Sequence, residues 1–549
     1  MDFPLTIPAL MRRADSLFGH RPVSGRRPDR SIQHATYASV LERSRRLGLA
    51  LQRLGVGRGE RVATLAWAGQ EHLEAYLAIP SIGAVLHTLN LRLHPDDLSY
   101  IVNDAQDVAL IVDESLLPLF ETFRSRTPSI RQVIVIPSIS PGSAPGAAGL
   151  SAVARADGYL DYESVIATAD PSQWKEVPLA EDDAAAMCYT SGTTGQPKGV
   201  LYSHRAIVLH SFSQGLVDSL GVGERDVLLP IVPMFHVNAW GLPFTGVMFG
   251  AGLVFPGPYL DGASVLDLIV RERVTVTAGV PTVWLGMLQE LDRQPGHHDV
   301  SCLRTIAIGG SAAPQSLIAA YQQRHNLRIV HAWGMTELTP LGTVCQLPPE
   351  LEAAPLDEQV RYRARQGKPL PFVEVRAIAD GHAVPWDGAT MGELEVRGPW
   401  VASQYFNVEG PDARFSDDGW FRTGDVVVIY PDGCVELTDR AKDLVKSGGE
   451  WISSVALENA LMAHPKVAEA AVVAVPHPKW DERPLAVVVL KPGQEASADE
   501  LRAFLAPSFA KWWLPDSIAF AAEIPRTSVG KFKKSILRDA YRDVYAQES

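Results

Sequence analysis

Residues 189–200 combine hydroxyl groups, glycines and one cation within a single short stretch. Glycine lets the backbone turn its N–H groups toward an anion, hydroxyls add short donors, and lysine supplies a point charge. A polyphosphate needs these groups, whereas a surface turn of small polar residues, the ordinary alternative, does not require such an ordered set. The stretch contains Thr190, Ser191, Gly192, Thr193, Thr194, Gly195, Lys198 and Gly199.

This loop does not follow the G-x-x-x-x-G-K-[ST] pattern of a Walker A site. Counting from Gly192 places Pro197, Lys198 and Gly199 at the last three positions of that pattern. The apolar run 184–189 before the loop predicts a buried strand. The segment after Ser203 predicts a helix with this serine as its N-cap. We therefore expect a phosphate-binding loop of another kind between a strand and a helix.

Motifs along the chain resemble, in the same order, those of the acyl-adenylate-forming (AMP-binding) enzymes, which include acyl-CoA synthetases, luciferases and amino-acid adenylation domains. One such motif is a weak signal, whereas an ordered set is a strong one. With the α/β layers that precede them, the resemblance covers essentially the whole chain. It is greatest to medium- and long-chain fatty acyl-CoA synthetases and to 3-methylmercaptopropionate–CoA ligases. The motifs lie at residues 189–200, 233–240, 309–314, 331–337, 419–425, 446–452 and 525–531.

The acid-binding side is expected around the second motif. His236 resembles the family's histidine at the acyl pocket, Trp240 resembles the tryptophan that gates fatty acyl chains, and Gly309 is assigned to the same pocket. An indole can plug an apolar tunnel, although packing in the core is the ordinary role of a lone tryptophan. No acid lies near His236 and Asn238 to pair with an ammonium group, which disfavours an α-amino acid as the substrate.

For the nucleotide, the resemblance implies that ATP binds with Mg²⁺. Thr336 is assigned to the α-phosphate, and Glu337 with Thr194 to the metal, since Mg²⁺ prefers few carboxylates together with phosphate and water. The family more often has tyrosine where this chain has Trp333; either ring can stack on adenine, but tryptophan lacks the phenolic hydroxyl. The other nucleotide contacts are assigned to Gly310, Ser311, Ala312, Gly334, Met335, Asp425 and Arg440.

The last two motifs are assigned to a mobile lid. The resemblance places Lys446, Gly448, Gly449 and Trp451 against the pantetheine arm of coenzyme A, and it makes Asp439 the hinge. Lys531 matches the catalytic lysine, so that the catalytic set is Lys531, His236, Thr336 and Glu337. A fixed cation is reasonable there, because a carboxylate must approach an α-phosphate and one ammonium at ~4 Å is worth about 4 kcal/mol at an effective dielectric near 20. Lys533 and Lys534 are expected to be solvated neighbours.

Strands alternate with helices through most of the chain, which predicts α/β layers with largely parallel sheets. We expect an α/β fold with a large multi-layer N-terminal domain over residues 1–438 and a small α+β C-terminal lid over residues 439–549. Expected strands include 61–65, 108–112, 133–136, 226–231, 274–278, 305–308, 328–331 and 393–396, and expected helices include 36–54, 71–79 and 454–463. A hairpin over 426–437 precedes a polar joint at 438–443.

The bulk properties exclude several classes of protein. At 549 residues the chain is too long for one core, and the net charge of −13 argues against non-specific binding of nucleic acid. No run approaches the ~18 apolar residues of a membrane span, and the N-terminus is not a convincing signal peptide. Scattered cysteines without CxxC spacing suit a reducing cytoplasm. A homodimer is expected only because related fatty acyl-CoA synthetases often dimerise.

The sequence therefore predicts an ATP-dependent acid–thiol ligase. It would convert an apolar carboxylic acid to an acyl-adenylate with release of pyrophosphate, then to acyl-CoA with release of AMP. One alternative is a ligase for 3-methylmercaptopropionate or another short or aryl acid. A non-catalytic acyl- or nucleotide-binding homologue is a second alternative. The run 309–313 also approaches the G-x-S-x-G elbow of hydrolases, but Ala313 stands at its last glycine.

Overall fold

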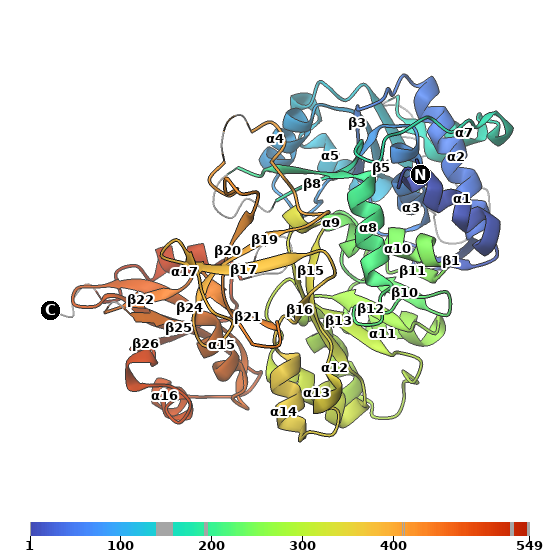
Figure 1. The fold of residues 1–549 in the computed structure, drawn as a ribbon. Coiled ribbons are helices and arrows are strands. Elements are labelled where there is room, and N and C mark those ends of the chain that lie inside the picture. The colour runs from blue at the N-terminus through green and yellow to red at the C-terminus, as the bar shows by residue number, and fades with distance from the viewer. Residues whose placement is uncertain are drawn as a thin grey trace.

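The computed structural model describes residues 2–138, 158–190, 196–408, 410, 412–448, 450–526 and 532–545. Figure 1 shows two large helix-flanked sheets in blue to yellow, an antiparallel sheet in orange beside them, and the C-terminal elements in orange to red on one side. The predicted fold class, with mainly parallel sheets followed by a smaller antiparallel C-terminal unit, is confirmed.

A seven-stranded sheet carries the first half of the predicted strands. All neighbouring strands pair in parallel except the last two, which form an antiparallel hairpin. Because helices cover both faces, its inner strands are nearly continuous apolar runs. In spatial order the strands are β7 (Leu160–Asp161), β6 (Gln132–Ile136), β5 (Asp107–Asp113), β3 (Arg61–Leu65), β4 (Val85–Thr88), β8 (Ala184–Tyr189) and β9 (Gly199–Ser203).

A nine-stranded sheet carries the strands after the phosphate loop. Its middle is parallel, whereas β2, β15 and β16 add antiparallel edges. The carboxyl ends of parallel strands are the usual place for ligand-binding loops. The strands in spatial order are β16 (Lys368–Pro369), β15 (Leu341–Cys345), β14 (Ile329–Gly334), β13 (Thr305–Ile308), β12 (Val276–Gly279), β10 (Val227–Pro230), β11 (Gly252–Phe255), β1 (Pro22–Arg26) and β2 (Ile32–Thr36).

A five-stranded antiparallel sheet follows and contains the predicted hairpin, whose turn has Gly433 at φ +83°. The predicted end of the hairpin at residue 437 is wrong, because residues 438–440 continue its last strand. Its register pairs Asp425 with Arg440 and Val426 with Asp439. The strands are β18 (His382–Ala383), β17 (Glu374–Ala379), β19 (Gly392–Arg397), β20 (Phe421–Ile429) and β21 (Val435–Arg440).

The C-terminal unit is a second five-stranded sheet with helices packed on it. The long hairpin of β24 and β25 forms its centre, and β26 pairs in parallel with β25. Its elements are β22 (Val445–Ser447), β23 (Glu450–Ile452), α15 (Ser454–Met462), β24 (Val467–His477), β25 (Asp481–Leu490), α16 (Ala498–Leu505), β26 (Ser517–Phe520) and α17 (Lys534–Ala540).

The helices begin where their sequences provide caps. The Ser203 hydroxyl accepts from the N–H of Ala206, as predicted, and the Ser497 hydroxyl accepts from the N–H of Glu500 at the start of α16. The remaining helices are α1 (Ile7–Phe18), α2 (Tyr37–Arg53), α3 (Gln70–Ser81), α4 (Pro95–Ala105), α5 (Leu117–Glu121), α7 (Tyr162–Ala167), α8 (His204–Gln214), α9 (Val237–Trp240), α10 (Leu242–Phe249), α11 (Gly262–Arg271), α12 (Pro281–Arg293), α13 (Gln315–His325) and α14 (Leu356–Arg363).

Lys534 corrects one sequence-based expectation. Instead of being solvated, this side chain is buried at the start of α17, with its Nζ 2.7 Å from Glu458 Oε1 and 2.6 Å from Ser454 Oγ. The Ser454 hydroxyl and N–H in turn donate to Asp439 Oδ2. A buried polar network therefore joins α17, α15 and the end of β21. Lys533 is exposed as expected.

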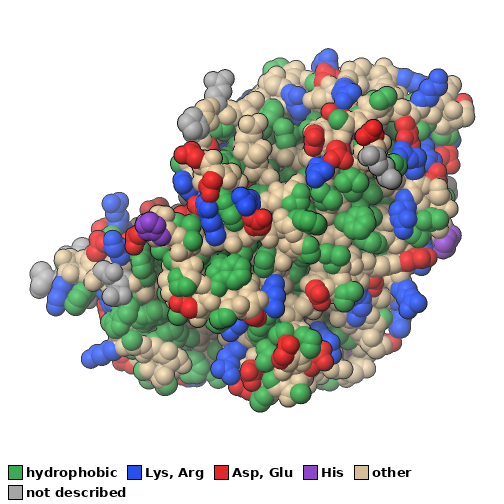
Figure 2. Space-filling model, viewed as in Figure 1, with side chains coloured by type: hydrophobic (Ala, Val, Ile, Leu, Met, Phe, Trp, Pro, Cys, Tyr) green, Lys and Arg blue, Asp and Glu red, His purple; other side chains and the backbone are tan. Residues whose placement is uncertain are grey.

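On the face shown in Figure 2, basic and acidic side chains are interspersed over the whole surface. Apolar side chains gather near α8, where Phe212 and Val217 are exposed. Among the residues described, every helix is too short or too polar to cross a membrane.

Candidate active site

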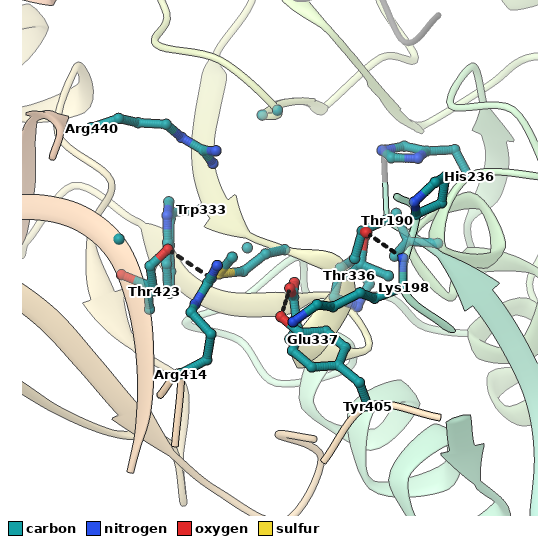
Figure 3. Close-up of a pocket in the computed structure, with 18 of the residues that line it drawn as sticks. Thr190, Lys198, His236, Trp333, Thr336, Glu337, Tyr405, Arg414, Thr423 and Arg440 are labelled. Atoms are coloured by element: carbon teal, nitrogen blue, oxygen red, sulfur yellow. Dashed lines mark hydrogen bonds between the residues drawn. The ribbon is translucent and has the colours of Figure 1, made fainter. Parts of the chain in front are cut away.

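A cavity of about 630 Å³ lies where the three sheets of the first 440 residues meet (Figure 3). Its walls come from the carboxyl ends of β8, β13 and β14, from the turn after β10 and from the hairpin of β20 and β21. This is the position expected for a ligand site in parallel α/β sheets. Motifs separated by hundreds of residues in the sequence are thus brought to one place.

The charges around the cavity favour an anion. Among the described residues that line it, Glu337 is the single acid, whereas the basic ones are Lys198, Arg414, Arg440 and Lys442. The net charge of the whole protein is −13, so this excess of positive charge is confined to the surroundings of the cavity. A concave site lined by one sign of charge attracts ligands of the other sign. The polar half of the cavity therefore suits a polyphosphate.

The two ends of the phosphate loop are held together. The N–H of Lys198 donates to Thr190 Oγ1 at 3.0 Å, and the N–H of Thr190 donates to the carbonyl of Lys198 at 2.9 Å (Figure 3). These bonds continue the antiparallel pairing of β8 and β9 and fix where the loop enters the cavity. The predicted contacts of Ser191, Gly192, Thr193, Thr194 and Gly195 lie outside the described residues.

Lys198 has a partner that sequence reasoning missed. Its Nζ lies 2.8 Å from Asp412 Oδ2 and 4.5 Å from the centre of the Tyr405 ring. Burial would raise the pKa of Asp412, but the hydrogen bond from Lys198 and its positive charge hold that pKa below its ordinary value. The positive charge of Lys198 is therefore partly compensated in this structure. The only sequence signal was an acid shortly before the motif at 419–425.

Thr336 and Glu337 follow β14 in a short 3₁₀ turn, and both side chains are buried yet border the cavity. Backbone contacts hold this turn, because Tyr202 donates its hydroxyl to the Thr336 carbonyl and the N–H of Ala402 donates to the Glu337 carbonyl. Tyr405 donates its hydroxyl to Glu337 Oε1 at 2.6 Å (Figure 3). The carboxylate is thereby oriented before any ligand binds.

A magnesium ion fits this donor set only together with a ligand. Among the described residues no cluster of three or more His, Cys, Asp or Glu side chains could hold a metal. Glu337 supplies one carboxylate at the cavity wall, with one oxygen taken by Tyr405. Mg²⁺ usually binds through one or two carboxylates plus phosphate oxygens and water. The arrangement therefore fits an ion that arrives with a phosphate.

Trp333 forms the wall opposite the phosphate loop. Its indole N–H donates to Asp425 Oδ2 at 2.8 Å. A tyrosine at this position would carry its donor, the phenolic hydroxyl, at a different place on the ring. Asp425 is buried behind this ring and does not itself line the cavity. Its Oδ1 lies 3.0 Å from Arg440 Nε but has no aligned hydrogen-bond donor. A buried acceptor of this kind is suited to a ligand hydroxyl.

Arg414 was also missed by sequence reasoning. Its guanidinium donates to the carbonyls of Arg422 and Thr423, which directs the side chain along the hairpin into the cavity (Figure 3). On the neighbouring wall, Gly309 and Gly310 line the cavity together with Gly334 and Met335. Ser311 and Ala312 continue from the glycines but are not part of the lining.

The wall of the cavity with His236 and Trp240 is built on an unusual turn. Val237, Asn238, Ala239 and Trp240 all have left-handed backbone angles, with φ between +44° and +55°. Each such residue costs roughly 1–2 kcal/mol, so the turn persists only because its surroundings hold it. It directs His236 and Trp240 into the cavity. The indole packs on Gly309, where an added Cβ would lie 3.0 Å from the ring.

The predicted lid residues that the structure describes lie away from the cavity. Among the described residues, none beyond Lys442 lines it. Lys446 and Trp451 are exposed on β22 and β23, with the Lys446 Nζ 5.8 Å from the Trp451 ring centre. Gly448 has φ +61° and donates its N–H to the Trp480 carbonyl at 2.8 Å. Gly449 and Lys531 lie outside the described residues.

Comparisons with known proteins agree with this geometry. The AMP-binding enzyme family matches residues 18–406, and the AMP-binding enzyme C-terminal domain matches residues 456–531. A long-chain-fatty-acid–CoA ligase of Thermus thermophilus is 47% identical, over 99% of this chain and 97% of the relative. A 3-methylmercaptopropionyl-CoA ligase of Ruegeria pomeroyi is 44% identical, over 98% of each.

A solved structure of the anthranilate CoA ligase AuaEII in complex with anthranoyl-AMP is similar with a TM-score of 0.86, at 26% identity, over 100% of this chain and 99% of that one. Both domain matches together extend from residue 18 to residue 531. The chain therefore belongs to the AMP-binding enzyme family.

Proposed function

We propose that this protein is an AMP-forming acyl-CoA ligase that activates an apolar carboxylic acid. The observation that carries the proposal is that one cavity joins a polar end, with Lys198 on one wall and Arg440 on the opposite wall beside Trp333, to an aromatic end closed by Trp240 on Gly309. A nucleotide triphosphate suits the first end and an acyl group the second. The similarity to acyl-CoA ligases over nearly the full chain supports the same activity.

In the first step the acid's carboxylate oxygen attacks the α-phosphorus of ATP, and the bond to the β-phosphate breaks to release pyrophosphate. The loop that starts at Thr190 would hold the leaving phosphates, Thr336 would donate to the α-phosphate, and His236 would contact the acid. Trp333 would stack on adenine, while Asp425 and Arg440 would hold the ribose. Aligning the reacting groups and neutralising charge is how such sites lower the barrier.

Two groups of this first step are proposed from the family alone. Glu337 and Thr194 would hold Mg²⁺, which when bound would neutralise charge on the phosphates. Lys531 would place its ammonium between the two reacting anions. Both assignments are supported by the carboxylate oriented at the cavity wall and by the match of the C-terminal domain through residue 531.

In the second step the thiol of coenzyme A attacks the acyl carbonyl and AMP leaves. We propose a boundary between domains at residues 438 and 439, with the lid rotating about Asp439. This would remove Lys531 and bring Lys446, Gly448, Gly449 and Trp451 to the cavity. In support, the described lid residues are exposed and none of them lines the cavity in this conformation.

The identity of the acid is the most specific part of the proposal. Trp240 packed on Gly309 closes the apolar end, which suits a small acid unless the indole moves aside. A medium- or long-chain fatty acid would require that movement. The second candidate is 3-methylmercaptopropionate, favoured by the closed indole and by relatives at 44% and 42% identity that carry this activity in their names.

Assembly and location complete the proposal. A homodimer would bury apolar side chains that Phe212, Leu216 and Val217 expose at the end of α8. Sedimentation of the wild type and of Val217→Asp tests this, since only the wild type should dimerise. A cytoplasmic location is supported by the cysteines, which are all unpaired.

The activity is tested by ATP–pyrophosphate exchange with straight-chain acids from butanoate to hexadecanoate and with 3-methylmercaptopropionate. Exchange that depends on one class of acid, followed by acyl-CoA formation, supports the ligase and identifies the acid. If none of these acids supports exchange although ATP binding is measurable, the ligase proposal fails and the non-catalytic binding homologue takes its place.

A further inference from the structure

Among the buried polar side chains of helix α8, His210 and Gln214 lie one turn apart, and both contact the segment of Trp240 and Gly241. Figure 1 shows α8 beside α10. The left-handed turn, which is labelled α9, leads directly into α10. Each side chain is 1% exposed. Polar groups buried this deeply persist where they make specific hydrogen bonds. Their partners show what they hold in place.

Gln214 holds the tryptophan through its backbone. The Gln214 side-chain N–H donates to the carbonyl of Trp240 at 2.7 Å. Its amide oxygen accepts the hydroxyl of Thr245, whose backbone N–H donates to the Gly241 carbonyl at 3.0 Å. Both carbonyls at the exit of the left-handed turn are therefore satisfied by one small network. The amide orientation is defined, because only the nitrogen can donate to a carbonyl.

His210 supports the same turn from the other side. The ring accepts from the N–H of Leu341 at 3.2 Å through Nε2. Gly241 packs so closely on this ring that an added Cβ would lie 2.7 Å from Nδ1, and its φ is +74°. The turn can therefore neither carry a side chain at Gly241 nor slide toward α8. Its position is determined by contacts, since its own residues disfavour left-handed angles.

We propose that Gln214 is a positioning residue that sets the length of the acyl pocket by fixing the Trp240 carbonyl and, with it, the indole over Gly309. This inference rests on the proposed function, in which Trp240 borders the acid. The left-handed turn is the element that moves. Without the Gln214 donor, the Trp240 carbonyl is buried and unsatisfied, the strained turn relaxes, and the indole leaves Gly309. The pocket then becomes longer.

The test compares Gln214→Met with the wild type in ATP–pyrophosphate exchange. Methionine keeps the volume and removes the donor. We expect the ratio of kcat/KM for dodecanoate over butanoate to rise about tenfold or more, which is the effect of one methylene in an apolar pocket. The KM for ATP should not change. Gln359→Met is the matched control, because Gln359 also donates to backbone carbonyls, but these belong to Glu352 and Ala354 and not to the turn that carries Trp240.

A double-mutant cycle with Trp240→Ala shows whether the effect passes through the indole. If it does, Gln214→Met changes the ratio in the wild type and has no further effect in the Trp240→Ala protein. An unchanged ratio in Gln214→Met, or the same change in both backgrounds, overturns the inference. Should Gln214→Met fail to fold, Thr245→Val removes the neighbouring donor and must shift the ratio in the same direction. No exchange by the wild type with any acid refutes the proposed function itself.

Discussion

The buried cation of Lys534 offers the sharpest test of how the C-terminal unit is held to β21. Its Nζ lies 2.7 Å from Glu458 Oε1, an attraction of about 6 kcal/mol at an effective dielectric near 20. Desolvation offsets much of this, so the pair as a whole need not stabilise the fold. Removing one partner is different, because it leaves a buried charge uncompensated, at a cost of about 3–5 kcal/mol.

Lys534→Met should therefore loosen the contact of α17 and α15 with β21 at neutral pH. Hydrogen exchange measured on these helices reports local opening, and a loss of about 3 kcal/mol corresponds to at least a hundredfold faster exchange. Lys533→Met is the matched control, because that neighbour is exposed. It should change local stability by less than about 0.5 kcal/mol. Equal exchange in the two variants would refute the reasoning.

The loss of stability in Lys534→Met should depend on pH, and the two acids that lose their cation, Glu458 and Asp439, set the direction of this dependence. Burial already raises the pKa of Glu458 above 4.5 and that of Asp439 above 3.8, although Lys534 opposes this. Without the cation both values rise further. Above about pH 4.5 the folded variant then holds protons that the unfolded chain releases, so its stability falls by about 1.4 kcal/mol per proton for each pH unit.

The stability of Lys534→Met should therefore approach that of the wild type near pH 5, and the two stabilities should differ most above pH 7. In the wild type, burial alone would lower the pKa of Lys534, but Glu458, Asp439 and Asp443 outweigh it and raise that pKa above 10.5. The contribution of Lys534 to stability therefore stays constant from pH 5 to pH 7.5 and is lost only at higher pH. A difference between variant and wild type that does not vary from pH 5 to pH 7.5 would contradict the assignment.

Three further predictions concern the active site. Lys531→Ala should abolish acyl-AMP formation in pyrophosphate exchange while sparing thioester formation from supplied acyl-AMP, and equal loss of both steps would remove Lys531 from its proposed role. Tyr405→Phe removes the hydroxyl that orients Glu337 and should raise the Mg²⁺ concentration for half-maximal exchange about tenfold, the effect of one charge-assisted hydrogen bond. Trp333→Phe keeps a stacking ring but leaves Asp425 without its indole donor, so the KM for ATP should rise about tenfold while the KM for the acid stays unchanged.

Local sequence signals predicted most of the fold. The strand β13 begins and ends where its apolar run does, and α8 starts at the serine expected to cap it. Such elements are specified within a few residues by burial pattern and capping chemistry. The hairpin of β20 and β21 was predicted from its Asp432–Gly433 turn, but its end was not. Polar residues 438–440 pair as a strand because a neighbouring strand supplies hydrogen bonds, which composition cannot show.

The partners of the active-site residues could not be predicted, because they depend on contacts over long sequence separations. Tyr405 reaches Glu337 across 68 positions, and Lys198 reaches Asp412 across 214. Neither partner belongs to a motif. Lys534 was expected in solvent because isolated lysines usually lie there, yet its buried site is created by Glu458 and Ser454 on another helix. Motifs predicted which residues gather, but not which groups orient them.

The left-handed turn at Val237–Trp240 shows where local reasoning must fail. Its residues include a β-branched valine and no glycine, so propensity argues against the backbone angles of Val237, Ala239 and Trp240 and tolerates only that of Asn238. The conformation exists because Gln214 and Thr245 bond its carbonyls and because His210 leaves room only for glycine at position 241. A conflict between local preference and global structure costs stability, and proteins keep it mainly where function requires it. Since this conflict falls on the turn that directs Trp240 into the cavity, it coincides with the wall for which we propose contact with the acid.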